Sequence, residues 1–153
     1  GRQPPMMAAT DNPIVTAARG WIGTPYRHQA SLQGVGCDCL GLIRGLWREL
    51  IGPEPEVAPP YTPDWSEPQG QEWLWQALTR HFHTPATAPQ PGDVLLLRMR
   101  VGTVAKHLGI LTATPAGPGL IHAYSGHGVV ESALGPAWQR RIAARFAFPE
   151  RVR

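Results

Sequence analysis

The hydrophobic pattern of this chain changes at about residue 93, and this change constrains the fold more than any other feature. Before that point, apolar residues recur every three or four positions, which is the period of a helix with one buried face. After it, short apolar runs are separated by turn residues, as is typical of β-strands. Because helices come first and strands follow, the sequence predicts an α+β fold in which N-terminal helices pack on a small antiparallel sheet.

Helix signals bound three segments of the first part. Asp11-Asn12 before Pro13 marks a helix start, and Gly52-Pro53 stops a later helix. A glycine-containing loop is expected over 24–38, and a proline-rich extended connection over 52–70. The expected helices cover residues 13 to about 22, 39 to about 51, and 71 to about 83.

The second part is expected to form a meander of five strands. Turn residues stand between the runs, and no internal repeat is present. The expected strands are 94–98, 107–112, 119–124, 128–132 and 142–148.

Composition places the chain among globular proteins. Of its 153 residues, 42% are hydrophobic and 16% charged, which suits one domain over 13–153. Residues 1–12 are polar and are expected to be a disordered segment or a tag remnant. No apolar run is long enough for membrane insertion, and no basic segment precedes an apolar one, so we expect no signal peptide.

The charge pattern gives little support to nucleic-acid binding. The net charge is +3, and nearly all positive charge comes from scattered arginines, since Lys106 is the only lysine. The densest cluster, RRIAAR at 140–145, alternates with apolar residues and indicates a strand with a charged outer face. We therefore expect no nucleic-acid partner.

The chain has two cysteines, and the position of Cys39 favours chemistry. It falls in the first turn of an expected helix, where free backbone N–H groups and the helix dipole stabilise a thiolate. Asp38 precedes it as a natural N-cap, and Gly41 follows in the same turn, which permits close packing or close approach of a substrate. A small buried core thiol remains an equally open interpretation of Cys39.

Two of the six histidines lie inside expected strands. His107 in KHLGIL and His122 in LIHAY are surrounded by apolar residues, and a buried imidazole needs hydrogen-bond partners. On neighbouring strands each ring can be the partner of the other, as in a thiol–imidazole site with a third polar group behind the base. Gly109 leaves the face of His107 bare, with room for a thiol or a substrate.

The other four histidines suggest structural positions. His81 and His83 end the third helix, His127 lies in an exposed turn, and His28 lies in the loop before Cys39. A zinc site is the sharpest competing hypothesis, with Cys37, Cys39, His107 and His122 as ligands. The C-x-C spacing is tighter than zinc knuckles use, so we expect no metal and no other cofactor.

Five motifs together resemble those of a known enzyme family. GTPYRHQ at 23–29, DCLGL at 38–42, PGDVLLL at 91–97, KHLGI at 106–110 and LIHAY at 120–124 occur in the order and spacing of the NlpC/P60 cysteine peptidases. The resemblance covers about residues 14–148 and is greatest to the phage-type branch, which includes the cell-wall peptidases of gene transfer agents.

The resemblance implies a papain-like catalytic domain and specific roles. Cys39 would be the nucleophile, His107 the general base and His122 the residue that orients it. Tyr26 would face the active site, and Asp38 and Leu40 would flank the nucleophile in the substrate or oxyanion region. The substrate would be a peptidoglycan stem peptide, commonly cut between γ-D-glutamate and a diamino acid, with no metal required.

Three positions depart from the family pattern. Leu40 replaces a serine that often follows the nucleophile, His28-Gln29-Ala30 replaces Trp-Gly-Gly, and Cys37 is extra. The oxyanion would then depend on backbone N–H groups and Tyr26. Cys37 is either a bystander or a source of sensitivity to oxidation.

Three alternatives to a peptidase remain open from the sequence: a catalytically silent cell-wall-binding or tail module, a thiol amidase, and an acyltransferase on the same fold. Without a signal peptide, the expected setting is a phage-like tail or baseplate, with tail proteins as partners, that acts in the periplasm of a target cell. A cytoplasmic enzyme is the other possibility.

Overall fold

The computed structural model describes residues 12–57, 61 and 72–149. Most of the segment expected to be disordered lies outside these residues, but Asn12 has a defined place. Its side-chain oxygen accepts hydrogen bonds from the backbone N–H groups of Ile14 and Val15, and its amide donates to the Pro91 carbonyl. Asn12 therefore caps the first helix and ties it to the turn before the first long strand.

The first described helix, α2 (Pro13–Arg19), is shorter than the hydrophobic pattern predicts. The chain tightens after Arg19, where Trp21 N–H bonds to the Ala18 carbonyl three residues back. Trp21 is buried although it lies outside the helix. The helix thus ends earlier than predicted, but the tight turn still places Trp21 on the predicted buried face.

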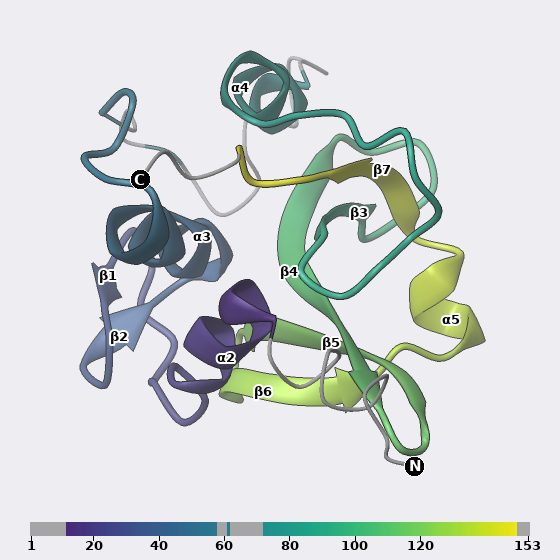
Figure 1. The fold of residues 1–153 in the computed structure, drawn as a ribbon, viewed down its shortest axis with the longest axis horizontal. Coiled ribbons are helices and arrows are strands. Elements are labelled where there is room, and N and C mark those ends of the chain that lie inside the picture. The colour runs from purple at the N-terminus through teal and green to yellow at the C-terminus, as the bar shows by residue number, and fades with distance from the viewer. Residues whose placement is uncertain (1–11, 58–60, 62–71, 150–153) are drawn as a thin grey trace, which may run out of the picture.

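The second predicted helix is α3 (Cys39–Leu50), and its bounds agree with the prediction to within one residue. The loop predicted before it contains a small hairpin of β1 (Ser31–Leu32) and β2 (Gly36–Cys37), which the sequence prediction missed. Each strand has two residues, too few for an alternating pattern to be visible. The hairpin lies beside the N-terminal end of α3 (Figure 1).

Two glycines let α3 approach its neighbours closely. A Cβ at Gly41 would overlap the backbone carbonyl oxygen of Ala30, and one at Gly45 would overlap the ring of Trp21. Gly41 thus serves close packing of the helix against the loop that precedes the hairpin.

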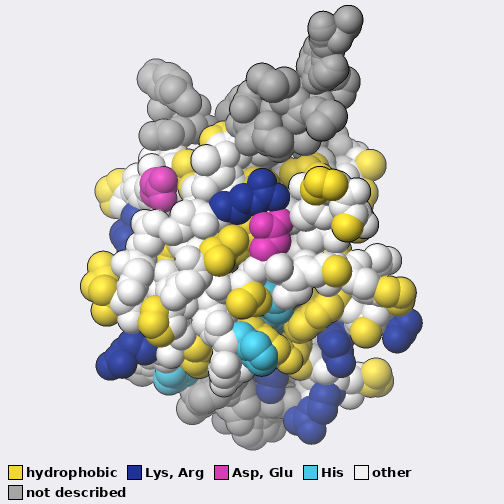
Figure 2. Space-filling model, turned by 90° about the horizontal axis from the view of Figure 1, so that it is seen from below, with side chains coloured by type: hydrophobic (Ala, Val, Ile, Leu, Met, Phe, Trp, Pro, Cys, Tyr) yellow, Lys and Arg dark blue, Asp and Glu magenta, His cyan; other side chains and the backbone are white. Residues whose placement is uncertain are grey.

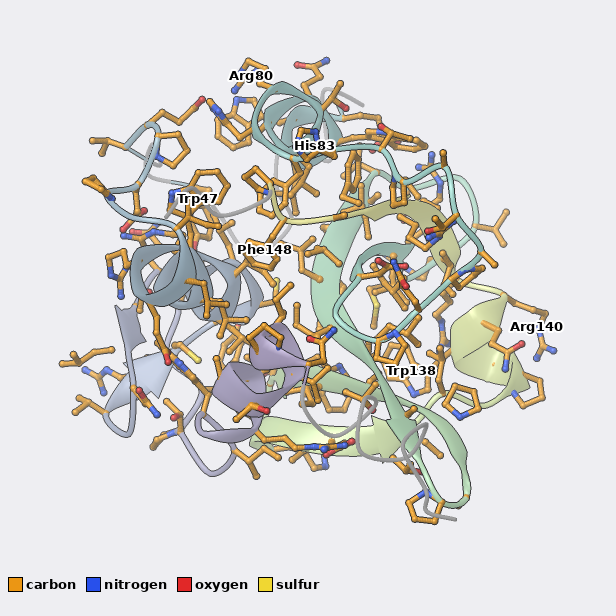
Figure 3. The ribbon with its side chains drawn as sticks, viewed as in Figure 1. Trp47, Arg80, His83, Trp138, Arg140 and Phe148 are labelled. Atoms are coloured by element: carbon orange, nitrogen blue, oxygen red, sulfur yellow. The ribbon has the colours of Figure 1, made fainter. Side chains whose placement is uncertain are left out.

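The third predicted helix is α4 (Trp73–His81), within the predicted range. Phe82, just after it, contacts Trp47 of α3 and Phe148 near the chain end, with ring centroids 5.3 and 4.9 Å apart. This aromatic cluster joins α3, the end of α4 and the segment after the last strand (Figure 3).

The five predicted strands form one antiparallel sheet in the order β6-β5-β4-β3-β7. Strands β3, β4, β5 and β6 follow one another as a meander, and β7 returns to the far side of β3 (Figure 1). Each strand overlaps its predicted range. Their bounds are β3 Val94–Arg98, β4 Ala105–Thr114, β5 Gly117–Tyr124, β6 Gly128–Ala133 and β7 Ile142–Phe146.

The two faces of the sheet bury different apolar clusters. One face, with Leu96, Leu108 and Ile121, packs against the helices in the main core. The other face carries a smaller cluster, and Trp138 of the four-residue helix α5 (Pro136–Gln139) packs on it. The fold is therefore α+β as predicted, with α5 as an additional element that the sequence prediction missed.

Candidate active site

The N-terminus of α3 is fixed by the carboxylate of Asp38. Its Oδ1 accepts a hydrogen bond from Gly41 N–H at 2.7 Å, as an N-cap does. Its Oδ2 accepts from Gln29 N–H at 2.7 Å and from the Tyr61 hydroxyl. The carboxylate is buried, so these three bonds hold both its charge and the start of the helix in one place.

The sulfur of Cys39 lies against the backbone of β4. The thiol donates to the Lys106 carbonyl at 3.6 Å, and the N–H groups of Leu108 and Leu40 face the sulfur. Pairing of β4 with β5 begins only at Ile110. Next to His107, the edge of β4 that faces β5 is therefore free of strand pairing and open to the thiol. This arrangement brings the helix-start cysteine beside the strand histidine.

His107 and His122 contact each other directly. Nε2 of His107 lies 2.7 Å from Nδ1 of His122, and Nε2 of His122 lies 3.1 Å from the Ser132 hydroxyl. Because this bond uses Nε2 of His107, Nδ1 is the ring nitrogen that remains for another partner. A polar chain thus leads from His107 through His122 to Ser132.

Aromatic rings enclose the histidine pair. The Trp138 indole stacks on His107 with centroids 5.8 Å apart at 29°, and it meets the edge of His122 at 5.0 Å. Tyr124 stacks on His122 from its own strand. Trp138 points from α5 toward the sheet, whereas Arg140 points away from it (Figure 3). The rings thus shield the pair from solvent, which leaves His107 8% and His122 1% exposed.

Burial keeps the thiol and both imidazoles neutral. Loss of hydration, with a smaller effect of the Asp38 charge, raises the pKa of Cys39 to about 12. Loss of hydration lowers the pKa of His107 to about 3 and that of His122 to about 4. The expectation that the helix start favours a thiolate is therefore wrong for the resting state, because burial outweighs the N–H groups of Leu40 and Leu108.

Tyr26 lies at the rim of this site. It forms an isolated bridge with Cys37, and its ring is partly buried. Burial and then the nearby Cys39 raise the pKa of its hydroxyl to about 12, so the group is a proton donor at neutral pH. The hydroxyl is therefore close enough to Cys39 to feel its charge.

One predicted detail of the site is corrected, and the place of Leu40 is defined. Gly109 does not make room for the thiol, because a Cβ there would overlap the Leu120 side chain, which fills that space. The Leu40 side chain lines an apolar cavity of about 80 Å³ between α3 and α4. The backbone N–H of Leu40, by contrast, faces the sulfur.

Sequence reasoning missed three residues of the site. Tyr61 lies in the proline-rich connection, yet its hydroxyl bonds to Asp38 and its carbonyl accepts from Gln29. Ser132 and Trp138 follow the last sequence motif. An aromatic residue within a proline-rich stretch was the only available signal for Tyr61, and none distinguished Ser132 from other strand serines.

The described residues contain no group of three or more histidine, cysteine, aspartate or glutamate side chains placed to hold a metal ion. Cys37 and Cys39 are both free thiols, and both are buried. The four-ligand zinc hypothesis therefore has no geometric support.

On the face drawn in Figure 2, histidines reach the surface among apolar side chains, and basic side chains lie at separate places.

The family follows from a sequence comparison that spans most of the site. Residues 23–146 match the NlpC/P60 family profile, a range that contains Tyr26, Cys39 and both paired histidines. The chain belongs to the NlpC/P60 family. No curated protein matches the chain in sequence.

Solved NlpC/P60 structures share the fold. A family member from Bacillus cereus ATCC 10987 has a TM-score of 0.59 at 16% identity, over 90% of this chain and 39% of that one. A Staphylococcus aureus Mu50 protein, described as similar to a lipoprotein of the NLP/P60 family, has a TM-score of 0.56 at 18% identity, over 90% of this chain and 40% of that one. The NlpC/p60 domain of the peptidoglycan hydrolase SagA has a TM-score of 0.50 at 24% identity, over 83% of this chain and 88% of that one. The chain thus spans about two fifths of the first two proteins.

The helices that the structure describes have four to twelve residues. Among the residues that the structure describes, none forms a helix both long and apolar enough to cross a membrane.

Proposed function

We propose that this NlpC/P60 domain is a cysteine peptidase that hydrolyses peptide bonds in peptidoglycan stem peptides. One observation carries the proposal. The Cys39 sulfur contacts the backbone next to His107, and the His107 ring is bonded to His122 at 2.7 Å. The peptidoglycan substrate class is supported by the SagA domain, which belongs to a peptidoglycan hydrolase.

In this proposal, proton transfer accompanies attack. Because the resting thiol and imidazole are both neutral, the Cys39 proton moves to Nδ1 of His107 as the C–S bond forms. The oxyanion is stabilised by the Cys39 backbone N–H and the Tyr26 hydroxyl. His107 then protonates the leaving amine as the C–N bond breaks, which leaves a thioester.

Hydrolysis of the thioester completes the cycle. His107 takes a proton from water, the hydroxide adds to the carbonyl carbon, and the C–S bond breaks as sulfur recovers its proton. His122 keeps the His107 ring aligned throughout. Asp38 fixes the start of the helix that carries Cys39, and Leu40 contributes a backbone N–H that faces the sulfur.

Mass spectrometry of digested stem peptides tests the proposal. We expect the wild-type protein to cleave them with or without EDTA, commonly between γ-D-glutamate and the diamino acid. Cys39→Ala, which removes the nucleophile and little volume, should lose activity by several orders of magnitude. Undiminished cleavage by this variant would contradict the thiol mechanism.

The other outcomes separate the alternatives. Loss of wild-type cleavage in EDTA would indicate a metal enzyme. Products joined to an added amine would indicate an acyltransferase. No cleavage by a folded protein would favour a silent cell-wall-binding or tail module.

The proposed setting is a phage-like tail or baseplate that opens the cell wall, supported only by the resemblance of the five motifs to the phage-type branch. The domain should then cleave purified cell-wall sacculi, and its activity should co-sediment with tail particles in a lysate of producing cells. Activity confined to the soluble cytoplasmic fraction would contradict this setting.

A further inference from the structure

Ser132 closes the polar chain behind the two histidines. In the β5–β6 pair, His122 lies opposite Val130 and Ser132 lies opposite Leu120, so Ser132 is the diagonal neighbour of His122 on the same face. Its hydroxyl lies 3.1 Å from Nε2 of His122, while Nδ1 of His122 bonds to His107. Both nitrogens of the buried His122 ring are therefore occupied.

Only two proton arrangements satisfy this chain. In the first, Nε2–H of His107 donates to Nδ1 of His122, and Nε2–H of His122 donates to the Ser132 oxygen. In the second, every bond is reversed, and His107 carries its proton on Nδ1, the ring nitrogen that is not bonded to His122. Only the first arrangement gives His107 a lone pair with which to accept the Cys39 proton.

Two features of the structure favour the first arrangement. The Cys39 thiol already donates to the Lys106 carbonyl, so the sulfur would offer only a weak acceptor to a proton on Nδ1 of His107. Ser132 is only partly buried, so its own hydroxyl proton can turn to water while its oxygen accepts from His122.

We propose that Ser132 is a positioning residue that sets the tautomers of His122 and, through it, of His107. The hydroxyl oxygen is the final acceptor that keeps both rings protonated on Nε2 and leaves Nδ1 of His107 free as the base. The link to catalysis rests on the proposed peptidase function, but the tautomers can be measured without it.

A matched pair of variants isolates the hydroxyl. Ser132→Thr and Ser132→Val have nearly the same shape, both suit a strand, and only threonine keeps the oxygen. Ser125→Ala, in the exposed turn of the same hairpin, is the control for changes unrelated to His122. Nitrogen-15 NMR of labelled histidine reports which ring nitrogen carries the proton, and stem-peptide cleavage gives kcat and KM.

The wild type, Ser132→Thr and Ser125→Ala should show both rings protonated on Nε2. Ser132→Val should show mixed tautomers, and its kcat should fall about tenfold, the effect of one buried hydrogen bond, with KM unchanged. Unchanged tautomers in Ser132→Val would overturn the proposal, whatever the activity. If the tautomers shift but no wild-type protein cleaves stem peptides, the positioning role stands and the proposed function fails.

Discussion

At the scale of single residues, the environment of Cys39 combines two opposing effects. Backbone N–H groups of Leu40 and Leu108 stabilise a thiolate, whereas burial and the Asp38 charge oppose it and prevail. The sulfur is thus protected from solvent at rest, and in the proposed mechanism it needs His107 to become a nucleophile. This differs from cysteines whose pKa is lowered by an exposed helix start.

The pH dependence of alkylation should reveal this neutral thiol. Because the pKa of Cys39 is raised to about 12, its thiolate fraction at neutral pH is small and grows as pH rises. We expect the rate of reaction with iodoacetamide, measured by mass spectrometry in a Cys37→Ala background, to keep rising up to at least about pH 9. A plateau near pH 7 would contradict the prediction.

Asp38→Asn is the informative companion variant. Asparagine is also a good N-cap, so the helix start can persist while the negative charge beside the sulfur is lost. The alkylation profile should then shift to lower pH.

The sequence identified the site residues that carry recognisable chemistry, and it placed Cys39, His107 and His122 near one another through the predicted elements. It could not identify Tyr61 or Ser132, because a hydroxyl group is common and only the three-dimensional neighbours of these residues distinguish them. The neutral state of the thiol also could not be predicted, since burial is a property of the assembled fold.

At the scale of elements, α3 depends on close contact with the loop before the β1–β2 hairpin. Gly41→Ala should cost about 3 kcal/mol or more of unfolding free energy, because the new methyl group meets a backbone carbonyl that cannot rotate away. Urea unfolding measures this loss. Gly135→Ala is the control, since nothing lies within 4 Å of a Cβ there, and it should cost about 1 kcal/mol or less. Equal stability of both variants would refute the close-contact argument.

Helix α5 has only four residues, and its importance lies in Trp138. Trp138→Ala should let water reach the histidine pair, so the pKa of His107, lowered to about 3 by burial, should rise toward its ordinary value. Trp138→Phe keeps a ring over His107 and should shift the pKa less. Proton NMR titration of the ring resonances checks both, and an unchanged titration in Trp138→Ala would show that the indole does not control hydration.

Long periodic elements were predictable and short ones were not. Helix α3 and the five sheet strands repeat their apolar pattern often enough to reveal their type. The β1–β2 hairpin and α5 contain two to four residues per element, so tertiary contacts determine them. For the same reason, no signal in the sequence indicated a role for Trp138.

At the scale of the whole molecule, the sheet separates two environments. Its helix-covered face carries most of the apolar core, while the opposite face holds the two buried histidines beside a smaller apolar cluster. Titratable groups are thus built into the packed interior, and folding stability must depend on their protonation.

Stability should fall as pH decreases from about 6.5, before carboxylates begin to titrate. The pKa values of His107 and His122 are lowered to about 3 and about 4, so between these values and 6.5 the unfolded chain binds more protons than the folded one. Stability contributed by the neutral pair is complete above pH 6.5 and is lost below it, by on the order of 8 kcal/mol in total once the pH has passed both folded-state pKa values. Calorimetric Tm values from pH 8 to pH 4 measure the effect.

Two variants separate the histidines from an acidic group. The bond from Arg19 lowers the pKa of Glu131, so Glu131 adds acid sensitivity only below its ordinary value of 4.5. His122→Gln should therefore flatten the decline in Tm between pH 6.5 and 4.5, while Glu131→Gln should leave that range unchanged and alter only the part below it. If His122→Gln kept the full wild-type slope above pH 4.5, burial of the neutral pair would not be the source of acid sensitivity, and the water-excluding role given to Trp138 would lose its energetic basis.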